Sequence, residues 1–519
     1  MKNIRIVCSV LMFLVLASCH ANRQDATNDK PRVIVTCDPE LDDNNSLIRY
    51  VLYSSGFDTE GIIYASSQFH WKGDGKGTTQ YIPGREYARP DRDLGPQTSW
   101  RWAEGERFID DIIEAYEKVY PNLKVHDPNY PTPDHLKSLI RVGNVEFEGD
   151  ISHDSPGSDL IKQVLLDDDS RPVFIQVWGG PSTASRALKS IQEEYEGTPE
   201  WEAIRARVSA KAKFCLSGHQ DQTYKEYVQV YWPQVESVSF DIGVANLGYG
   251  ARNAVPNIKD TIYFSAAWTS EMIKSQGILG DMYRVWGDGK QMSKDDFTDY
   301  FGLSGYSAQE LISMGYWVWT PPQPYGNFIS EGDTPCYLNL IDNGLRAHES
   351  QEYGGWAGRR KSNSDHVDIL DFSNQFIFDT MDSMSHKSDN HPEYPDYIPA
   401  IQNDFAARMA WSATSEFSAV NHNPVITGPY ALDASAGETI KIRTRVKDPD
   451  RDSMVFSWTQ HKVGSHNGEV RIEGADSMSP SVKIPSDAKS GDVFHLIMTA
   501  EDNGQPSLVR YHRTVITVR

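Results

Sequence analysis

The sequence is short of positive charge, and this shortage excludes one large class of partner. Its 50 lysines and arginines stand against 72 aspartates and glutamates, which leaves a formal net charge of −22. Proteins that bind nucleic acids need basic surfaces to neutralise the phosphate backbone. We therefore expect no nucleic-acid partner, and expect a neutral ligand or a cation instead.

Cysteine is also scarce, and its spacing excludes a common metal site. Two of the five cysteines, Cys8 and Cys19, lie in the N-terminal leader. The other three, Cys37, Cys215 and Cys336, are far apart and form no CxxC pair, so we expect no structural zinc site. Because three is an odd number, at least one of these thiols must be free.

Long hydrophobic runs are absent after the N-terminal leader, so the sequence predicts no membrane-spanning helix there. The leader begins with the basic MKNIR and continues with the apolar IVCSVLMFLVLA, as secretory signal peptides do. It ends in LASC, which resembles the lipobox of bacterial lipoproteins; an ordinary signal peptide with a coincidental cysteine is the alternative. We expect a signal over residues 1–19, lipidation of Cys19 and a polar tether over 20–31. This arrangement predicts a membrane-anchored protein of the bacterial cell envelope, on the periplasmic side or the cell surface.

The remaining chain is long enough for two domains. Over residues 32–420, apolar strands such as RVIVTC, RPVFIQV and AKFCL alternate with amphipathic segments of helical periodicity. This alternation is typical of an α/β fold with a mostly parallel sheet and helices on both faces. Over residues 422–519, short alternating runs separated by turn residues predict an immunoglobulin-like β-sandwich.

Four acidic residues in TCDPELDD follow the first expected strand. Asp42 and Asp43 could simply cap the next helix, because carboxylates are stable at a helix N-terminus. Asp38 fits that explanation poorly, because it precedes a proline at the exit of the strand. In parallel sheets, ligands bind beyond the carboxyl ends of the strands. Clustered carboxylates repel one another unless a cation neutralises them, and oxygen ligands indicate a hard cation such as Ca²⁺.

This stretch resembles the DxDPGxDD motif of nucleoside hydrolases. Asp38, Asp42 and Asp43 are kept, whereas Thr36 replaces the first Asp and Glu40 replaces the Gly. The resemblance implies that Asp38 and Asp43 bind Ca²⁺, that Asp38 also activates the attacking water, and that Asp42 holds a sugar hydroxyl.

Two later stretches resemble the same family. VWGGPSTAS matches a turn whose threonine, here Thr183, supplies a backbone carbonyl to the metal. EGDTPCYLNLI matches a late His-Asp pair: Asp333 keeps the aspartate that completes the metal shell, and Gly332 replaces the histidine. The resemblance thus implies a Ca²⁺ shell of Asp38, Asp43, Asp333 and the Thr183 carbonyl, with Asp42 and Asp333 facing the sugar diol.

The order of segments more closely resembles bacterial secreted proteins described as cellulose-binding, which pair a nucleoside hydrolase-like domain with an immunoglobulin-like one. YGGWAGR and IPAIQNDFAARM are among the stretches that carry this resemblance. It implies a carbohydrate ligand and leaves three hypotheses: a Ca²⁺-dependent glycosidase, a non-catalytic carbohydrate-binding protein on a degenerate fold, and a nucleoside N-ribosyl hydrolase. The sequence leaves the oligomeric state open, a homo-oligomer included.

Further site residues follow from the expected chemistry. A sugar leaving group needs a proton, and His70, His219, Asp221 and Glu331 are candidate donors. For His70, His219 and Asp221, a surface or hydrogen-bonded structural role is the more common one. Flat aromatic faces suit sugars, but tryptophans also fill cores. The tryptophans expected near the strand ends are Trp71, Trp178, Trp317, Trp319 and Trp356, of which Trp71, Trp178 and Trp356 are the predicted substrate contacts.

The C-terminal domain contains one acidic motif. KDPDRDS places Asp448, Asp450 and Asp452 at alternate positions, as in the first half of an EF-hand loop. The glycine and the distal glutamate of that loop are missing. The sequence therefore favours a solvated turn over a Ca²⁺ site here.

Overall fold

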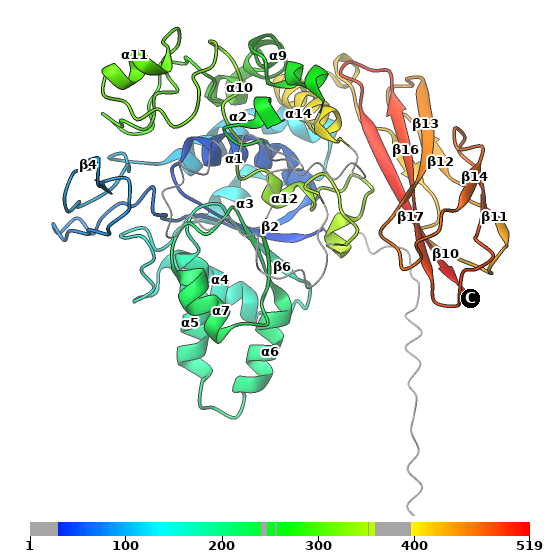
Figure 1. Ribbon diagram of the computed structural model, residues 1–519, viewed down its shortest axis with the longest axis horizontal. Coiled ribbons are helices and arrows are strands. Elements are labelled where there is room, and N and C mark those ends of the chain that lie inside the picture. The colour runs from blue at the N-terminus through cyan, green and yellow to red at the C-terminus, as the bar shows by residue number, and fades with distance from the viewer. Residues whose placement is uncertain (1–29, 240–246, 255–256, 351, 359–395) are drawn as a thin grey trace, which may run out of the picture.

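A parallel six-stranded sheet forms the centre of the first domain (Figure 1). The computed structural model describes residues 30–239, 247–254, 257–350, 352–358 and 396–519, so the predicted signal, tether and Cys19 lie outside the described residues, apart from the last two tether positions. The strand order is β5-β2-β1-β6-β7-β8, and every neighbouring pair is parallel. The strands are β1 (Arg32–Cys37), β2 (Asp58–Tyr64), β5 (Ile140–Val142), β6 (Val173–Val177), β7 (Ala212–Leu216) and β8 (Glu236–Ser239).

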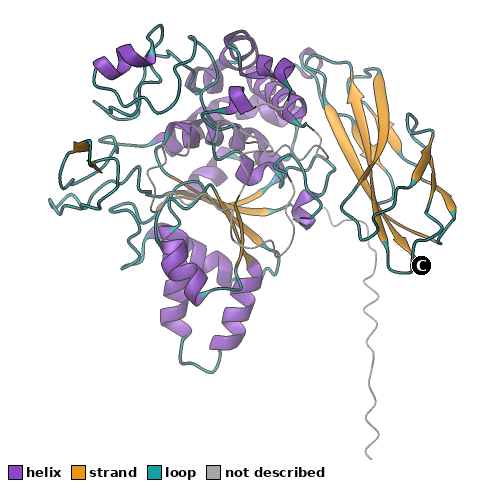
Figure 2. Cartoon of the chain, in the orientation of Figure 1, coloured by secondary structure: helices purple, strands orange, loops and turns teal. Residues whose placement is uncertain are grey.

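Helices cover both faces of this sheet, as the sequence predicts (Figure 2). One face packs on α1 (Leu41–Tyr53), α2 (Phe108–His126), α10 (Gly277–Met282) and α14 (Ile398–Ala413). The other packs on α4 (Pro156–Leu166), α5 (Ser182–Tyr195) and α6 (Trp201–Lys211). Successive side chains of a strand point to opposite faces, so Val33 and Val35 enter the first core and Ile34 enters the second. The α/β fold with a parallel sheet is confirmed.

The remaining α-helices in the described part of the first domain are short. They are α3 (Pro133–Ser138), α7 (Gln229–Tyr231), α8 (Ala251–Ala254), α9 (Ala266–Thr269), α11 (Ala308–Ser313) and α12 (Pro335–Leu338). Two strands, β3 (Ala88–Arg89) and β4 (Arg92–Asp93), form a small ribbon within the polar insertion at 68–104. That insertion has its own aromatic core of Trp71, Tyr87 and Trp100.

The strand order fixes where a ligand can bind. Chain connections run outward from β1 in one direction and from β6 in the other, so the topology reverses between these two neighbours. Thr36 of β1 lies level with Val177 of β6, and both strands therefore end side by side. A crevice at such a reversal is the usual ligand site of an open parallel sheet. The acidic motif follows β1 at this point.

The C-terminal domain is all β, as predicted. A four-stranded sheet has the order β10-β17-β16-β13 and a three-stranded sheet the order β11-β15-β14, with β9 and β12 pairing beside them. The strands are β9 (Val425–Thr427), β10 (Ala431–Ala434), β11 (Thr439–Lys441), β12 (Arg445–Lys447), β13 (Met454–His461), β14 (Arg471–Glu473), β15 (Ser481–Lys483), β16 (Val493–Asp502) and β17 (Val509–Val518). Trp458, Val482 and Phe494 are central in their shared core.

Strand β17 joins the two domains. The buried Arg513 donates to the carbonyl oxygens of Leu345 (2.6 Å) and Tyr353 (2.8 Å) in the first domain. The backbone N–H of Tyr511 donates to the Asn343 carbonyl at 2.9 Å, and the Tyr511 ring belongs to the core of the first domain. The sandwich is therefore docked through buried contacts.

Two expectations concern cysteines and membrane spans. Among the described residues, Cys37, Cys215 and Cys336 are buried thiols that form no disulfide. Within the described ranges, no helix is both long enough and apolar enough to cross a bilayer.

Candidate functional site

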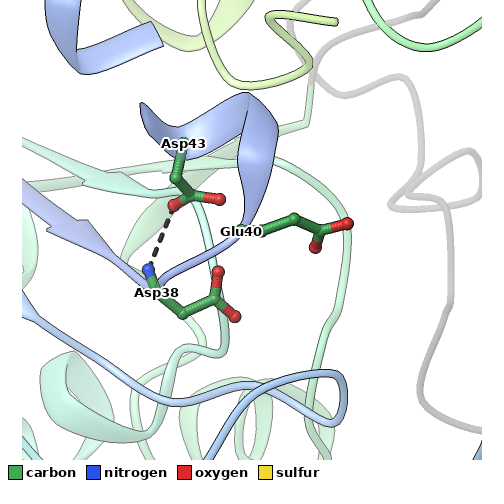
Figure 3. Close-up of side chains that lie close together, drawn as sticks. All are labelled: Asp38, Glu40 and Asp43. Carbon is green, nitrogen blue, oxygen red and sulfur yellow. Dashed lines mark hydrogen bonds between the residues drawn. The ribbon is translucent and has the colours of Figure 1, made fainter. Parts of the chain in front are cut away.

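Carboxylates from the first strand exit converge in space (Figure 3). The Asp38 backbone N–H donates to Asp43 Oδ1 at 3.0 Å, which folds the motif back on itself. Oxygens of Asp38, Glu40 and Asp43 lie within 4.8 Å of one another, and so do oxygens of Asp42, Asp43 and Asp333. Asp43 belongs to both groups, so the five carboxylates form one acidic cluster, the name used for them below.

Two contacts with α1 bring Asp333 to this cluster although it is almost 300 residues away in sequence. The Asn45 side-chain amide donates to the Ser330 and Arg284 carbonyls, each at 3.1 Å. One turn later, the Arg49 guanidinium donates to Glu331 Oε1 at 3.0 Å. Both contacts are buried, and they hold the segment before α12 against the helix that carries Asp42 and Asp43.

Glu331 is thus a structural residue, and its prediction as a general acid is wrong. Arg49 binds both of its carboxylate oxygens, and the hydroxyls of Tyr283 and Thr334 donate to them as well. The side chains of Arg49 and Glu331 are fully buried. The residue next to Gly332 therefore supports the site and does not face it.

Three oxygens of the cluster have no hydrogen-bond partner among the described residues. They are both carboxylate oxygens of Asp38 and Oδ2 of Asp333, and all three are buried. Burial, with the charge of Asp42, raises the pKa of Asp38 to about 6. Burial and the neighbouring carboxylates also raise the pKa values of Asp43 and Asp333 well above the usual range. Buried polar atoms are normally paired, so these oxygens require a ligand.

A hard divalent cation fits this donor set. The donors are carboxylate oxygens alone, and they come from residues whose side chains are almost completely buried. Ca²⁺ takes six to eight oxygen ligands, often from aspartates, and its charge would offset the repulsion that raises these pKa values. Asp43 is common to both groups of close oxygens, whereas Asp38 and Asp333 belong to different groups. The shell of Asp38, Asp43 and Asp333 that the resemblance implies would hold the ion across both groups, and it stays a prediction.

Two glycines make room for the cluster. A Cβ atom at Gly179, just after β6, would lie 3.0 Å from Asp38 Cγ. A Cβ atom at Gly332 would lie 2.4 Å from Asp42 Oδ2. The Asp42 carboxylate thus occupies the space next to position 332, which explains why no side chain is present there.

The exposed edge of the cluster contains residues that the sequence analysis did not assign. The Tyr249 hydroxyl donates to Glu40 Oε1 at 3.3 Å and reaches Asp42 Oδ1 at 3.5 Å. Glu40 is 17% exposed, whereas Asp38 is completely buried. The replacement of the motif glycine by Glu40 was the available sequence signal. Nothing local to Tyr249, more than 200 residues later, marked it.

His70 lies at this edge, but not as a ready proton donor. Its Nδ1 is 2.9 Å from the Arg101 carbonyl, which only accepts, so the proton is on Nδ1. Its Nε2 is 3.8 Å from Glu40 Oε2 and carries no proton in this tautomer. Burial and the charge of Arg101 lower the pKa of His70 to about 3. His70 is therefore neutral at pH 7 with an unprotonated Nε2 toward Glu40, and this arrangement does not fit its predicted role as a general acid.

Three further predicted residues lie around the strand ends. His219 follows β7 and is buried, with its ring 4.5 Å from the Tyr224 ring, and its catalytic role stays a prediction. Asp221 caps α5 by accepting from the Ser182 backbone N–H at 3.0 Å. Thr183 lies in the first turn of α5, and its hydroxyl accepts from the Asn144 backbone N–H. The metal contact of the Thr183 carbonyl stays a prediction.

The three tryptophans predicted to bind sugar fill cores instead, which corrects that prediction. Trp71 packs on Tyr87 and Phe147 in the insertion, and Trp178 packs on Tyr50 and Tyr337. Trp356 is buried in the first-domain core. Each is at most 1% exposed, so no ring face remains for a ligand.

A different tryptophan lies near the acidic cluster. Trp319 is half-buried, and its ring centroid is 4.6 Å from that of Tyr249, in an edge-on arrangement. Tyr249 in turn stacks on Phe301. These three rings form an aromatic wall beside Glu40 and Asp42.

The parallel sheet, its reversal between β1 and β6, and the acidic cluster at that point define a nucleoside hydrolase-like protein. Residues 32–360 match the family described as cellulose-binding Sde182, nucleoside hydrolase-like domain, and the chain belongs to that family. Residues 439–518 match the C-terminal domain of cellulose-binding protein Sde0182.

A solved structure agrees over almost the whole chain. It is a nucleoside hydrolase-related hypothetical protein from Saccharophagus degradans, described as associated with carbohydrate metabolism. The two are 25% identical with a TM-score of 0.66, and the match covers 95% of this chain and 100% of that one. The titin M3 domain is matched over 18% of this chain and 96% of its own length, at 17% identity. The TM-score of 0.13 is too low for any conclusion about this chain. None of the curated proteins matches the chain.

Proposed function

We propose that the protein is a Ca²⁺-dependent hydrolase that cleaves a glycosidic bond of a carbohydrate. The carrying observation is the Asp38 carboxylate, which is buried at the sheet reversal with neither oxygen hydrogen-bonded to the described residues. Such a group is costly unless it binds a cation, a substrate or a water molecule. Ca²⁺ held by Asp38, Asp43 and Asp333 would orient a water molecule and make it more acidic.

The side chains of the site then accept the proton, position Asp38 and bind the sugar. Asp38 accepts the proton of the attacking water, because neither of its carboxylate oxygens has a partner among the described residues, so one could bind Ca²⁺ while the other accepts the proton. Asp43 fixes Asp38 through the backbone N–H of that residue. Asp42 and Asp333 accept hydrogen bonds from sugar hydroxyls. Direct attack by water on the face opposite the leaving group gives inversion at the anomeric carbon.

Glu40 and the partly exposed rings of Tyr249 and Trp319 are assigned to the sugar itself, and the buried Phe301 ring supports Tyr249 by stacking on it. Glu40 is more exposed than Asp38, Asp43 and Asp333, and Tyr249 ties it to Asp42. Aromatic faces and edges pack well on the C–H surfaces of a pyranose. The descriptions of the family and of the related S. degradans protein favour a carbohydrate over a nucleoside.

Carbohydrate capture without hydrolysis is the second candidate function. Position 332 has no side chain, Glu331 is held by Arg49, and His70 carries no proton toward the site. A sugar alkoxide leaves poorly without a proton donor. The description of the family as cellulose-binding agrees with such a role.

One experiment separates these functions. The purified chain is incubated with a panel of glycans and nucleosides, in Ca²⁺ and in a chelator, and both binding and product are measured. The proposal predicts glycan products that disappear with the chelator and in Asp38→Asn, but persist in Asp168→Asn, an exposed acid in the same domain. Glycan binding without product would favour capture, and release of a nucleobase would favour a nucleoside hydrolase.

We also propose that the chain is anchored to the bacterial cell envelope through a lipidated Cys19. The LASC sequence at the end of the leader supports this. Cys19→Ala should move the protein from the membrane fraction to the soluble fraction, and equal membrane association of both chains would contradict the anchor.

A further inference from the structure

A second acidic group lies in the C-terminal domain, in the loop between β12 and β13. One carboxylate oxygen from each of Asp448, Asp450 and Asp452 lies within 4.8 Å of the others. Asp448 is buried, with 7% exposure, so the prediction of a solvated turn is wrong for it. The reason is that the loop packs against the end of β16, where the Asn503 backbone N–H donates to the Ser453 carbonyl.

Hydrogen bonds within the loop satisfy only one of the two carboxylate oxygens of Asp448. Its Oδ1 accepts from the backbone N–H groups of Asp450 and Asp452, both at 2.9 Å. Its Oδ2 is buried and has no partner among the described residues. A turn explains the first oxygen and leaves the second without a donor, although buried carboxylate oxygens are normally paired.

The carboxylate of Asp502, on another strand, also has one buried oxygen without a partner among the described residues. Asp502 ends β16, opposite Met454 in the first pair of β13, and is 4% exposed. Its Oδ1 accepts from the Asn421 side chain and from the backbone N–H groups of Gly504 and Leu508. Its Oδ2 is buried without a partner among the described residues. Burial is the largest cause that raises the pKa of Asp502, the hydrogen bonds to its carboxylate lower it, and the negative charge of Asp448 raises it. The two carboxylates are therefore close enough to repel each other.

Positive charge does not balance this group. Within the described parts of the chain, no lysine or arginine forms an ion pair with any of these four aspartates. The basic side chain in contact with them is His422, whose Nδ1 lies 3.0 Å from Asp450 Oδ1, and burial lowers the pKa of this imidazole. Four carboxylates with two buried, unpartnered oxygens are unfavourable unless a cation joins them.

We propose that the β12–β13 loop binds a divalent cation, best matched by Ca²⁺, through Asp448, Asp450 and Asp452, with Asp502 adding charge from β16. Carboxylate oxygens at alternate positions of one loop suit the coordination that Ca²⁺ prefers. This site is separate from the acidic cluster of the first domain and does not depend on the proposed hydrolase activity.

The site lies where the linker from the first domain reaches the sandwich. Asp450 accepts from the His422 backbone N–H at 2.7 Å, and Asp502 accepts from the Asn421 side chain at 2.9 Å. His422 also contacts His126 of α2 through its Nε2, at 2.9 Å. A cation that orders Asp450 and Asp502 would therefore stabilise the attachment of the sandwich to the first domain.

Terbium luminescence tests this site directly, because Tb³⁺ replaces Ca²⁺ and emits when an excited tryptophan is near. The Trp411 ring stacks on His422, whose imidazole contacts Asp450, so Trp411 is a suitable energy donor. The full mature chain is titrated with Tb³⁺ and then with competing Ca²⁺. Asp452→Asn is the main variant, because the Asp452 side chain is partly exposed and its carboxylate accepts no hydrogen bond from the described residues, whereas its backbone N–H, which binds Asp448, is kept.

Asp476→Asn is the matched control, since Asp476 is an exposed acid of the same domain and its change removes the same charge. Both variants keep the first-domain carboxylates, so a difference between them reports the C-terminal site alone. We expect Asp452→Asn to lose at least tenfold in Tb³⁺ affinity and most of the Ca²⁺-dependent rise in Tm, and Asp448→Asn to behave alike. Equal titrations and equal Tm shifts of Asp452→Asn and Asp476→Asn would overturn the proposal.

Discussion

At the scale of single residues, the function proposed for the first domain depends on a few side chains whose surroundings do not satisfy them. Asp38 is completely buried and has two unpaired oxygens, while its neighbours Asp42, Asp43 and Asp333 carry charge of the same sign. In a stable protein such an arrangement is retained for a ligand more readily than for packing, because buried unpaired charges destabilise the fold.

The raised pKa values predict how Ca²⁺ stabilises the protein. Folding raises the pKa of Asp38 from 3.8 to about 6, so the folded, Ca²⁺-free protein is favoured below pH 3.8 and loses that stability as the pH rises through about 6. Asp42 shifts in the same direction, also to about 6. Added Ca²⁺ should therefore raise Tm more at about pH 7 than at about pH 4.5. Differential scanning calorimetry measures this; a Tm shift that is equal at both pH values would contradict the assignment.

The glycine at 332 predicts a selective loss of function. Gly332→Ala places a methyl group 2.4 Å from the present position of Asp42 Oδ2, so the Asp42 carboxylate must move. Because a side-chain end can move cheaply, we expect Tm to change little while KM for the glycan rises at least tenfold. Gly56→Ala, where a Cβ atom meets nothing within 4 Å, is the control. Unchanged kinetics of Gly332→Ala would exclude Asp42 from substrate binding.

At the scale of elements, α1 organises the site through its N-terminus and its middle. Its N-terminus carries Asp42 and Asp43, and its middle holds the segment before α12 through Asn45 and Arg49. Asp333 reaches the cluster only because these buried contacts fix that segment. The Arg49–Glu331 pair therefore stabilises the fold around the site and takes no part in the proposed reaction.

Breaking that pair should therefore mainly lower the free energy of unfolding. Glu331→Gln leaves the buried Arg49 without its counter-ion, and we expect about 3 to 5 kcal/mol of destabilisation. Glu349→Gln breaks an Arg–Glu pair that is partly exposed to solvent and should cost less than about 1 kcal/mol. Urea denaturation of both variants measures the difference. Equal losses would show that Glu331 does not hold the segment before α12 in place.

The sequence is sufficient to predict those site residues whose position depends only on local pattern and sheet topology. Asp38, Asp42 and Asp43 follow a strand and open a helix, so their position needs only β1 and α1. The errors arise where tertiary packing decides: Glu331 meets an arginine from a distant helix, and Trp71, Trp178 and Trp356 fill cores that periodicity does not reveal. Tyr249 joins the cluster across more than 200 residues, and no short motif could mark it.

At the scale of the whole molecule, the sandwich is a docked part of the protein. Arg513 crosses from β17 to carbonyl oxygens of the first domain, and Tyr511 lies in the first-domain core. The proposed cation at the β12–β13 loop would act on the same attachment, from the side of the linker. A domain fixed in this way holds its surface in a constant position relative to the acidic cluster.

This docking predicts that the two domains unfold together. Arg513→Met leaves buried carbonyl groups without donors, so we expect a loss of at least about 2 kcal/mol and a lower Tm. Arg510→Met, on the same strand but partly exposed, should change Tm little. Calorimetry should show one transition for the wild type. Two separate transitions, with the first unaffected by Arg513→Met, would contradict the docking.

The most direct measurement of the central claim is a crystal structure of the chain grown with Ca²⁺, with an anomalous difference map. The account predicts a Ca²⁺ peak about 2.3 to 2.6 Å from oxygens of Asp38, Asp43 and Asp333. It is contradicted if no peak lies among these carboxylates, or if their free oxygens pair with lysine or arginine side chains instead.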